Sequence, residues 1–250
     1  MKIIAIIPAR YQSTRFEGKP LADLAGKPVI QHVFERASRS AAVSMAVVAT
    51  DDERIRAAVE DFGGRVIMTA PCHRSGTDRI AEAAEILGLA ADDIVVNIQG
   101  DQPLFESCQI DEVIAPLKTD PSLEMTTLIY RIRIPEEITH PNAVKVVFDR
   151  DNFALYFSRA TIPYVRDRAM NTPYYKHHGI YAYRRSFLST FAALPEGTME
   201  KLEALEQLRA MEYGHRIKVV ETDFDSLEID TRDDLKRAKD ILMANINDRK

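Results

Sequence analysis

The first part of the chain alternates between short apolar runs and amphipathic segments, and this alternation restricts the fold more than any other feature of the sequence. The apolar runs are rich in Val and Ile, as expected of parallel strands buried on both faces, and comprise residues 2–7, 44–50, 65–69 and 93–98. The segments between them repeat apolar residues at helical spacing and comprise residues 27–40, 50–64 and 76–88. Because helices alternate with strands, the sequence predicts βαβ units and an α/β fold with a doubly wound, mostly parallel sheet.

The pattern changes after about residue 125. Residues 124–132 and 143–157 show the longer alternation of half-buried strands, and DRDN within the second favours a turn between antiparallel strands. Residues 158–187 are rich in aromatic and basic side chains and have little helical periodicity. We therefore expect a single domain over residues 1–250, with an antiparallel lobe added at about residues 126–195 that covers a site or contacts another subunit.

Two further helices are predicted near the end of the chain. Residues 198–214 have strong helical periodicity and end at Gly214, a residue suited to the left-handed position after a helix. Residues 231–246 form the second, which begins at Thr231, a residue type favoured as an N-cap.

The composition excludes several classes of protein. The chain has 250 residues, 46% of them hydrophobic, and a net charge of −5, so it can form one sizeable core but lacks the basic surface of a general nucleic-acid-binding protein. Cys72 and Cys108 form no CxxC pair, which indicates reduced thiols rather than a disulfide framework or a zinc site. No apolar run approaches the roughly 20 residues that span a bilayer, and the N-terminal segment is unlike a signal peptide. We therefore expect a soluble, cytoplasmic protein.

A basic loop follows the first predicted strand. The sequence PARYQSTRFEGKP, residues 8–20, contains Arg10, Arg15 and Lys19, and Lys27 follows it. Ligands of open α/β sheets bind beyond the carboxyl ends of the strands, where this loop lies, and its cations, small residues and backbone N–H groups can wrap a polyphosphate. The spacing matches neither GxxxxGK[ST] nor GxGxxG. The position favours phosphate binding; the alternative is a solvated basic loop.

Two carboxylates follow predicted strands. DIVVNIQGDQPL places Asp101 at the ligand-facing end of a buried strand, and SLEIDTRDDL places Asp230 before a capped helix. Mg²⁺ commonly takes one or two protein carboxylates and completes its shell with substrate phosphates and water. These aspartates are therefore candidate magnesium ligands, although an isolated Asp more often serves in a turn.

Two other segments carry polar residues. HRSGTDRI, residues 73–80, has small polar residues before a helix, which can present backbone groups to a base or a phosphate or can simply start the helix. YKHHGIYAY brings His177, His178, Tyr181 and Tyr183 close together; a lone histidine here is most often structural, and two histidines beside tyrosines only modestly increase the case for a polar pocket. HExxH is absent and no Ser/His/Asp or Cys/His order stands out, so hydrolysis through a covalent nucleophile has no support.

Several motifs occur together in an order that resembles one enzyme family. They are IPARYQSTRFEGKPL, HRSGTDRI, NIQGDQPL, NAVKVVFD, ALYFSRATIP, HHGIYAY, LEQLRAMEYG and EIDTRDDL. In this order, over about residues 3–240, the chain resembles the 3-deoxy-manno-octulosonate cytidylyltransferases, also called CMP-Kdo synthetases. The resemblance implies a nucleotide-diphospho-sugar transferase-like three-layer fold, a homodimer, and an added lobe that serves sugar binding and dimer contact. It also implies a Mg²⁺-dependent reaction of CTP with 3-deoxy-D-manno-octulosonate (Kdo) that gives CMP-Kdo and pyrophosphate for lipopolysaccharide biosynthesis.

The resemblance also implies roles for individual residues. The nucleotide site it implies comprises Ala9, Arg10, Ser13, Arg15, Lys19, Ser75, Gly76, Thr77 and Arg79. The sugar-acid site it implies comprises Gln99, Arg159, His177, Tyr181, Glu206 and Gln207. Metal binding is expected at Asp101 and Asp230, and catalysis at these two aspartates with Arg10, Arg15 and Lys19. In such a mechanism, the anomeric hydroxyl attacks the α-phosphorus while the loop cations take up charge on the departing pyrophosphate.

The chain departs from the family pattern at three places. Gln102 stands where the family often has Glu, His178 stands where it usually has Leu, and the segment before YKHHG is short. GDQPL and YKH resemble a branch that acts on the 8-amino analogue of Kdo. We expect Kdo as the substrate, with 8-amino-3,8-dideoxy-manno-octulosonate as the alternative.

Three other functions compete with this one. A cytidylyltransferase for a sialic-acid relative would differ in the segments around Arg159, His177 and Glu206, which here match the Kdo enzymes. A glycosyltransferase of similar fold more often carries a DxD motif, which GDQ is not. A nucleotide-binding regulator without activity would be expected to have lost a metal carboxylate or a loop cation, and this chain keeps both kinds of residue.

Overall fold

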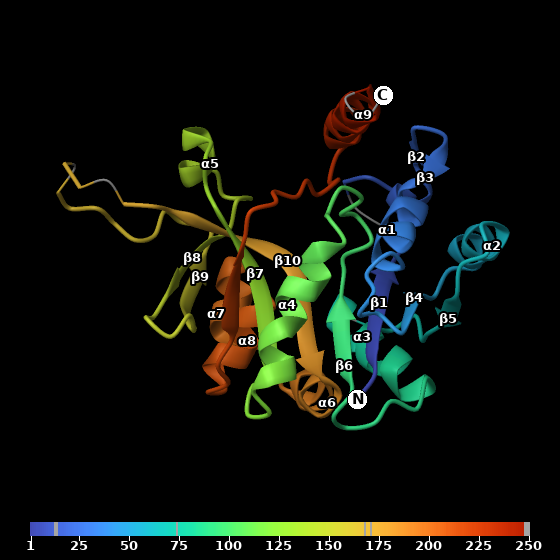
Figure 1. Ribbon diagram of the computed structural model, residues 1–250, viewed down its shortest axis with the longest axis horizontal. Coiled ribbons are helices and arrows are strands. Elements are labelled where there is room, and N and C mark those ends of the chain that lie inside the picture. Colours follow the sequence, from blue (N-terminus) through green and yellow to red (C-terminus); the bar gives the residue numbers. More distant parts are fainter. Residues whose placement is uncertain (13–14, 74, 168, 171, 248–250) are drawn as a thin grey trace.

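The structure is a computed structural model of the chain and describes residues 1–12, 15–73, 75–167, 169–170 and 172–247. Its main sheet lies between two layers of helices, and an arm of the chain extends away from one end of the sheet (Figure 1). A separate small sheet is formed by β2 (Asp23–Leu24) and β3 (Lys27–Pro28). The three-layer α/β arrangement is the one that the strand–helix alternation predicts.

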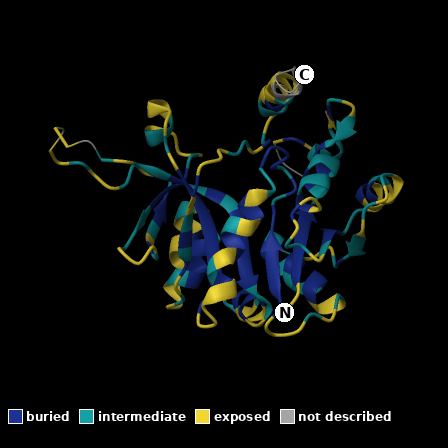
Figure 2. Ribbon diagram, viewed as in Figure 1, coloured by how far each residue is buried: buried dark blue, intermediate teal, exposed yellow. Residues whose placement is uncertain are grey.

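The main sheet is mostly parallel. Its strands run in the order β11 (Lys218–Thr222), β7 (Met125–Arg131), β10 (Tyr175–Arg184), β6 (Ile94–Asn97), β1 (Ile3–Ala9), β4 (Met45–Thr50) and β5 (Val66–Met68). Neighbours in this order are parallel except at β10, which is antiparallel to both β6 and β7. Every residue of β1 is buried, which explains why this strand has an unbroken apolar sequence (Figure 2).

The two faces of the sheet bury separate hydrophobic cores. Ile4 and Ile6 of β1 face the core that includes residues of α3 (Gly76–Ile86) and α6 (Arg185–Ala193). Their neighbours in β1 face the other core, with residues of α1 (Val29–Ala37), α2 (Glu53–Asp61) and α4 (Cys108–Thr119). Successive side chains of a strand point to opposite faces, so both sets of β1 side chains are buried and both are apolar.

The helices predicted in the first part of the chain are confirmed. They are α1, α2 and α3, and the last two begin with side-chain caps. Asp52 accepts from the Arg54 N–H at the start of α2, and Ser75 and Asp78 form a capping box at the start of α3. Helices α4 and α6 were not predicted; in α4, Pro116 interrupts the sequence signal near the end of the helix.

Within about residues 126–195, where an added lobe is expected, β7 and β10 lie inside the main sheet. β8 (Lys145–Phe148) branches from the main sheet by pairing with β10 and carries β9 (Ala154–Ser158), whereas α5 (Pro135–Thr139) and the arm that precedes β10 lie outside the sheet. β8 and β9 are antiparallel and joined at DRDN, as predicted, with Asn152 at φ 58°. The sequence signal was ambiguous for β10, because aromatic and basic residues obscure a strand that is largely buried.

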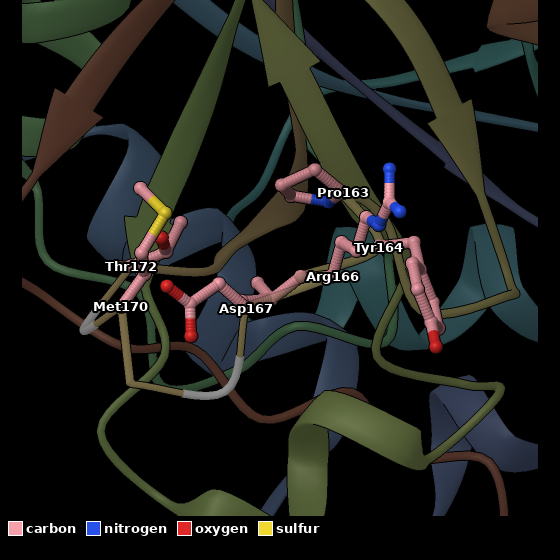
Figure 3. A pocket seen from close by; sticks show the side chains of 7 residues that line it. Pro163, Tyr164, Arg166, Asp167, Met170 and Thr172 are labelled. Atoms are coloured by element: carbon pink, nitrogen blue, oxygen red, sulfur yellow. The ribbon is translucent and has the colours of Figure 1, made fainter.

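The arm holds a hollow of about 450 Å³ that is formed by residues of the arm itself (Figure 3). Its lining includes Pro163, Tyr164, Arg166 and Met170. Tyr164 is 86% exposed and Met170 is 64% exposed, so the arm presents large apolar side chains to its surroundings. Within the part of the chain that the structure describes, none of the predicted site residues lines this hollow.

The single helix predicted over residues 198–214 is wrong, because the segment forms two short helices. These are α7 (Thr198–Glu203) and α8 (Gln207–Glu212), separated by Ala204 in the left-handed conformation at φ 50°. Arg159 donates to the carbonyls of Glu203 and Ala204 and so pairs polar groups that the break exposes. Gly214, at φ 84°, follows α8 as predicted.

The last predicted helix is confirmed as α9 (Arg232–Asn247). Its cap is Thr231, whose Oγ1 accepts from the Asp234 N–H at 3.2 Å. Among the described residues, no helix combines the length and the apolar character needed to cross a membrane.

Candidate functional site

A cleft of about 390 Å³ lies at the carboxyl end of β1 and joins segments that are far apart in the sequence. It is bordered by the loop after β1, the start of α3, the residues after β6 and the segment before α9. The residues that line it are Pro8, Ala9, Arg10, Gln12, Arg15, Lys19, Pro20, Ser75, Gly76, Gln99, Gly100, Asp101 and Asp230. Most of the predicted nucleotide residues and both predicted metal ligands therefore share one cleft.

Opposite charges meet directly in this cleft. Lys19 Nζ lies 2.6 Å from Asp101 Oδ2 and 3.3 Å from Asp230 Oδ1. Arg15 Nη1 lies 2.9 Å from Asp230 Oδ2. The two aspartates, separated by more than half of the chain, thus face a single ammonium group. We call Arg15, Lys19, Asp101 and Asp230 the ionic side of the site.

The loop that carries Lys19 is shaped by a close backbone contact. The Gly18 N–H donates to the Tyr11 carbonyl at 2.9 Å, and Gly18 has φ 70°. A Cβ at Gly18 would lie 3.1 Å from the Tyr11 ring, so glycine suits this position for both its conformation and its size. Directly after this turn, η1 (Lys19–Leu21) aims Lys19 back toward the sheet.

The pKa of Lys19 shows which effect dominates on the ionic side. Burial alone lowers it, but the charges and hydrogen bonds of Asp101 and Asp230 outweigh burial and raise the pKa above 10.5. Lys19 is therefore protonated at neutral pH and balances the two carboxylates.

Glu228 is a third carboxylate that the sequence analysis missed. Gln102 Nε2 donates to Glu228 Oε1 at 2.9 Å. Although the residue as a whole is exposed, desolvation of its carboxyl group, followed by the charges of Asp101 and Asp230, raises the pKa of Glu228 to about 7. Glu228 lies two residues before Asp230, and this spacing was the available signal that the two carboxylates share a site.

The remaining nucleotide residues are placed differently from one another. Arg10 Nη2 donates to the His73 carbonyl at 2.9 Å beside the start of α3. Ser13 lies outside the described residues. Arg79 is only 1% exposed and binds Asp51 at 3.0 Å and Thr69, behind the cleft rather than on its surface. Burial lowers the pKa of Arg79. Lys27, the last cation of the basic stretch, pairs with Glu35 at 2.7 Å and is absent from the cleft lining.

The predicted sugar residues gather next to the cleft. Thr77 Oγ1, beside cleft residue Gly76, donates to Glu206 Oε2 at 2.6 Å. Gln99 Nε2 donates to Asn97 Oδ1 at 3.1 Å, and Asn97 pairs in register with Tyr181 across β6 and β10. The rings of Tyr181 and His177 lie 5.1 Å apart.

The helix break brings in the last two of these residues. Gln207 opens α8 and is 4% exposed, and its Nε2 has no hydrogen-bond partner among the described residues. Arg159 is held at the break by carbonyls of Glu203, Ala204 and Pro141 and does not line the cleft. We call His177, Tyr181, Glu206 and Gln207 the buried side of the site.

Burial controls the ionisation of the buried side. It lowers the pKa of His177 to about 3, with a smaller effect from His178, so this imidazole is neutral at pH 7. It raises the pKa of Tyr181 and also that of Glu206, although hydrogen bonds from Ser75 and Thr77 oppose the shift at Glu206. The neutral imidazole of His177 and the neutral phenol of Tyr181 suit a ligand rich in hydroxyls.

His178 does not belong to this group. Its Nδ1 lies 3.4 Å from Gln109 Nε2 of α4, and its Nε2 lies 3.6 Å from Asp225 Oδ1. Adjacent strand residues point to opposite faces, so His178 faces α4 while His177 faces the Phe157 ring at 5.2 Å. Of the two residues that depart from the family pattern, only Gln102 borders the site.

Comparison with known proteins gives a consistent result. A family model described as cytidylyltransferase matches residues 4–217. A 3-deoxy-manno-octulosonate cytidylyltransferase of Syntrophus aciditrophicus is 69% identical over 97% of this chain and 98% of its own length. An 8-amino-3,8-dideoxy-manno-octulosonate cytidylyltransferase of Shewanella oneidensis is 54% identical over 98% of this chain and 100% of its own.

A solved structure agrees with these relatives. It is CMP:2-keto-3-deoxy-manno-octonic acid synthetase complexed with CTP, with a TM-score of 0.91 and 43% identity over 98% of this chain and 100% of that chain. The likeness extends over the whole sheet and both helical layers, which confirms the fold that the sequence motifs imply.

Proposed function

Because the chain belongs to the 3-deoxy-manno-octulosonate cytidylyltransferase family, we propose that it transfers CMP from CTP to the anomeric hydroxyl of Kdo, giving CMP-Kdo and pyrophosphate. The observation that carries the proposal is the ionic side, where two cations and two carboxylates from three distant segments meet in one cleft. Transfer of a phosphoryl-type group needs little covalent work from the protein, so positioning and charge are what such a site must supply.

The loop cations would bind the triphosphate. Arg15 and Lys19 lie on one wall of the cleft, and Arg10 lies beside the start of α3. Charge on pyrophosphate increases as it departs, and preorganised cations stabilise such charge more strongly in the transition state than in the ground state.

The two aspartates fit a magnesium ion. Asp101 Oδ2 and Asp230 Oδ1 both lie within 3.3 Å of Lys19 Nζ, so two carboxylate oxygens converge on a point that already accommodates a cation. Hard oxygen ligands in this number are what Mg²⁺ commonly takes beside a phosphate substrate. When bound, Mg²⁺ would act as a Lewis acid toward the α-phosphate. With Mg²⁺ bound to the two carboxylates, the Lys19 ammonium group would instead pair with the phosphates of the triphosphate.

The buried side would hold the sugar acid. Its groups can donate to and accept from sugar hydroxyls, and the neutral imidazole of His177 is positioned by Thr127 Oγ1 at 2.9 Å. Arg159 would act on this side by fixing the helix break that places Glu206 and Gln207.

The alternative substrate is 8-amino-3,8-dideoxy-manno-octulosonate. Relatives with this name are almost as similar to the chain as several relatives named for Kdo, which supports keeping both sugars in the test. Kdo is the primary proposal because the 69% identical relative carries that name.

The oligomeric state, the compartment and the pathway of the enzyme can be proposed as well. We propose a cytoplasmic homodimer that serves lipopolysaccharide biosynthesis, without nucleic-acid partners or membrane insertion. The exposed Tyr164 and Met170 on the arm support a subunit contact. Cys72 and Cys108 are both free, which supports a reducing compartment. A nucleotide-binding regulator without activity is disfavoured because the cleft retains both predicted metal carboxylates and the loop cations Arg15 and Lys19.

The test is Mg²⁺-dependent pyrophosphate release with each of the four common ribonucleoside triphosphates, paired with Kdo, 8-amino-Kdo or N-acetylneuraminate. Release with CTP and Kdo is expected. Release mainly with CTP and the amino sugar would keep the chemistry and change the substrate. Release with no pair would contradict the proposal.

A further inference from the structure

A small hydrophobic core lies next to the ionic side and is separate from the two cores on the faces of the sheet. We call it the satellite core, and its buried members are Phe16, Leu24, Val29, Leu104, Ile229 and Ala238. Phe16 is 7% exposed, whereas Ile229 and Ala238 are completely buried. Ala238 belongs to α9, which contacts β2 beyond the end of the main sheet (Figure 1).

Each segment that contributes a charged residue to the ionic side also contributes an apolar residue, close to it in sequence, to the satellite core. Phe16 directly follows Arg15, and Ile229 directly precedes Asp230. Leu104 lies shortly after Asp101 in the sequence, separated from it by Gln102 and Pro103. At each place a charged side chain enters the cleft while a residue close to it in sequence is anchored below.

Hydrogen bonds tie these anchors to the charged residues. The Ile229 N–H donates to the Asp101 carbonyl at 2.9 Å, which links the two aspartate segments directly. The Lys19 N–H lies 3.4 Å from the Phe16 carbonyl. At the start of α9, the N–H groups of Asp230 and Thr231 donate to Asp234 Oδ2 at 3.2 and 2.8 Å.

Packing supplies order on the ionic side that the exposed ion pair of Arg15 with Asp230 does not supply. The side chain of Arg15 is 59% exposed, and ion pairs of exposed side chains contribute little to fixing a geometry. Close-packed apolar side chains, in contrast, leave few alternative positions. The Arg232 guanidinium, 5.2 Å from the Phe16 ring, adds a direct contact between α9 and the loop.

We propose that Phe16 is a positioning residue and that, through the satellite core, helix α9 sets the spacing between the loop cations and the two aspartates. The kinetic part of this inference depends on the proposed function, whereas the structural part does not. Misplacement of reacting groups by about an ångström costs about a hundredfold in rate, so displacement of these anchors should be visible in turnover.

The kinetic experiment compares Phe16→Ala with Phe16→Leu and with Phe187→Ala. Phe187 is a core phenylalanine of α6 near the opposite end of the sheet, where the adjacent Ser186 and Arg185 bond to Ala91 and Asp93. Its truncation controls for loss of stability alone. We expect Phe16→Ala to lower kcat about tenfold to a hundredfold, with a smaller rise in KM for CTP. Phe16→Leu should restore most of kcat, and Phe187→Ala should lower Tm at near-normal kcat.

A variant on α9 tests the helix itself. Ala238→Val adds volume to the satellite core without touching the cleft, and we expect it to lower kcat in the same direction as Phe16→Ala. It also keeps the test informative if Phe16→Ala does not fold. Normal kcat in both folded variants, or an equal loss of kcat in Phe187→Ala, would overturn the proposal.

Amide hydrogen exchange gives a readout that does not depend on activity. Exchange at the Ile229 N–H should accelerate in Phe16→Ala and in Ala238→Val but not in Phe187→Ala, because only the first two variants loosen the bond to Asp101. Unchanged exchange in both would overturn the inference. If the wild-type protein releases no pyrophosphate with any substrate pair while exchange behaves as expected, the proposed function fails and the positioning role stands.

Discussion

The ionic side and the buried side of the site hold their polar groups in opposite ways. On the ionic side, cations and carboxylates neutralise one another, so Lys19 keeps its charge even though it is largely buried. On the buried side, loss of water favours the neutral form of His177. The difference matches the proposed ligands, since a triphosphate requires charge to be ready in place and a sugar requires neutral hydrogen-bonding groups.

The largest expected effect is at Asp101. Asp101→Asn keeps the size of the side chain but removes a charge from the ionic side, and we expect turnover to fall by about a hundredfold to a thousandfold, the range for loss of one preorganised electrostatic group. The measurement is steady-state pyrophosphate release, with circular dichroism to show that the fold is retained. Near-normal activity would contradict the metal assignment of Asp101.

Lys19 and Arg15 should differ in importance. Lys19→Met removes the group that faces both aspartates and is expected to lower kcat/KM for CTP by about a hundredfold. Arg15→Gln removes a more exposed cation with one partner, and a loss of about tenfold is expected. The two variants should be assayed together at the same ionic strength. A larger loss for Arg15→Gln would reverse our ranking of the two cations.

A change on the buried side should act mainly on the sugar. In Glu206→Gln the bond from Thr77 can persist, but the acceptor loses its charge, and KM for the sugar is expected to rise about tenfold, as for a weakened hydrogen bond to a charged group. KM for CTP should change little. Determination of both KM values in one variant tests the division of the site, and a rise confined to CTP would contradict it.

The smallest effect is the pH dependence of stability from His177. Because burial lowers its pKa from 6.5 to about 3, the unfolded chain binds a proton in this interval that the folded protein does not. Stability from this group therefore falls as pH decreases, by about 2 kcal/mol at most between pH 6.5 and about pH 5. Urea unfolding of wild type and His177→Gln at both pH values measures it.

Wild type must be compared with His177→Gln because the contribution of Glu228 to stability changes with pH in the opposite direction. Its pKa is raised from 4.5 to about 7, so the folded protein binds the extra proton there and stability falls as pH increases through this interval. The difference between wild type and His177→Gln removes this contribution. Equal pH slopes for the two proteins would show that His177 is not kept neutral by the fold.

Much of the fold was predictable because its signals are local. Strand burial on both faces shows in β1, β4 and β6 as apolar sequence that is interrupted only by the last residues of β4 and β6, Thr50 and Asn97. Asp52, Ser75 and Thr231 mark helix starts through bonds to their own neighbours. The same local logic failed at residues 198–214, where good helix formers continue through Ala204. There the break is stabilised by Arg159, from a distant strand end.

The sequence by itself determined the alternation of strands and helices, the basic loop behind the first strand, and the residue types available for phosphate and metal. Only the tertiary structure decided that Asp101 and Asp230 face one ammonium group, that Glu228 joins them, and that His178 turns away from His177. The reason is physical. A periodic pattern reports which way one segment faces, whereas distances between segments, and the pKa values that depend on them, arise only when the cores pack the segments together.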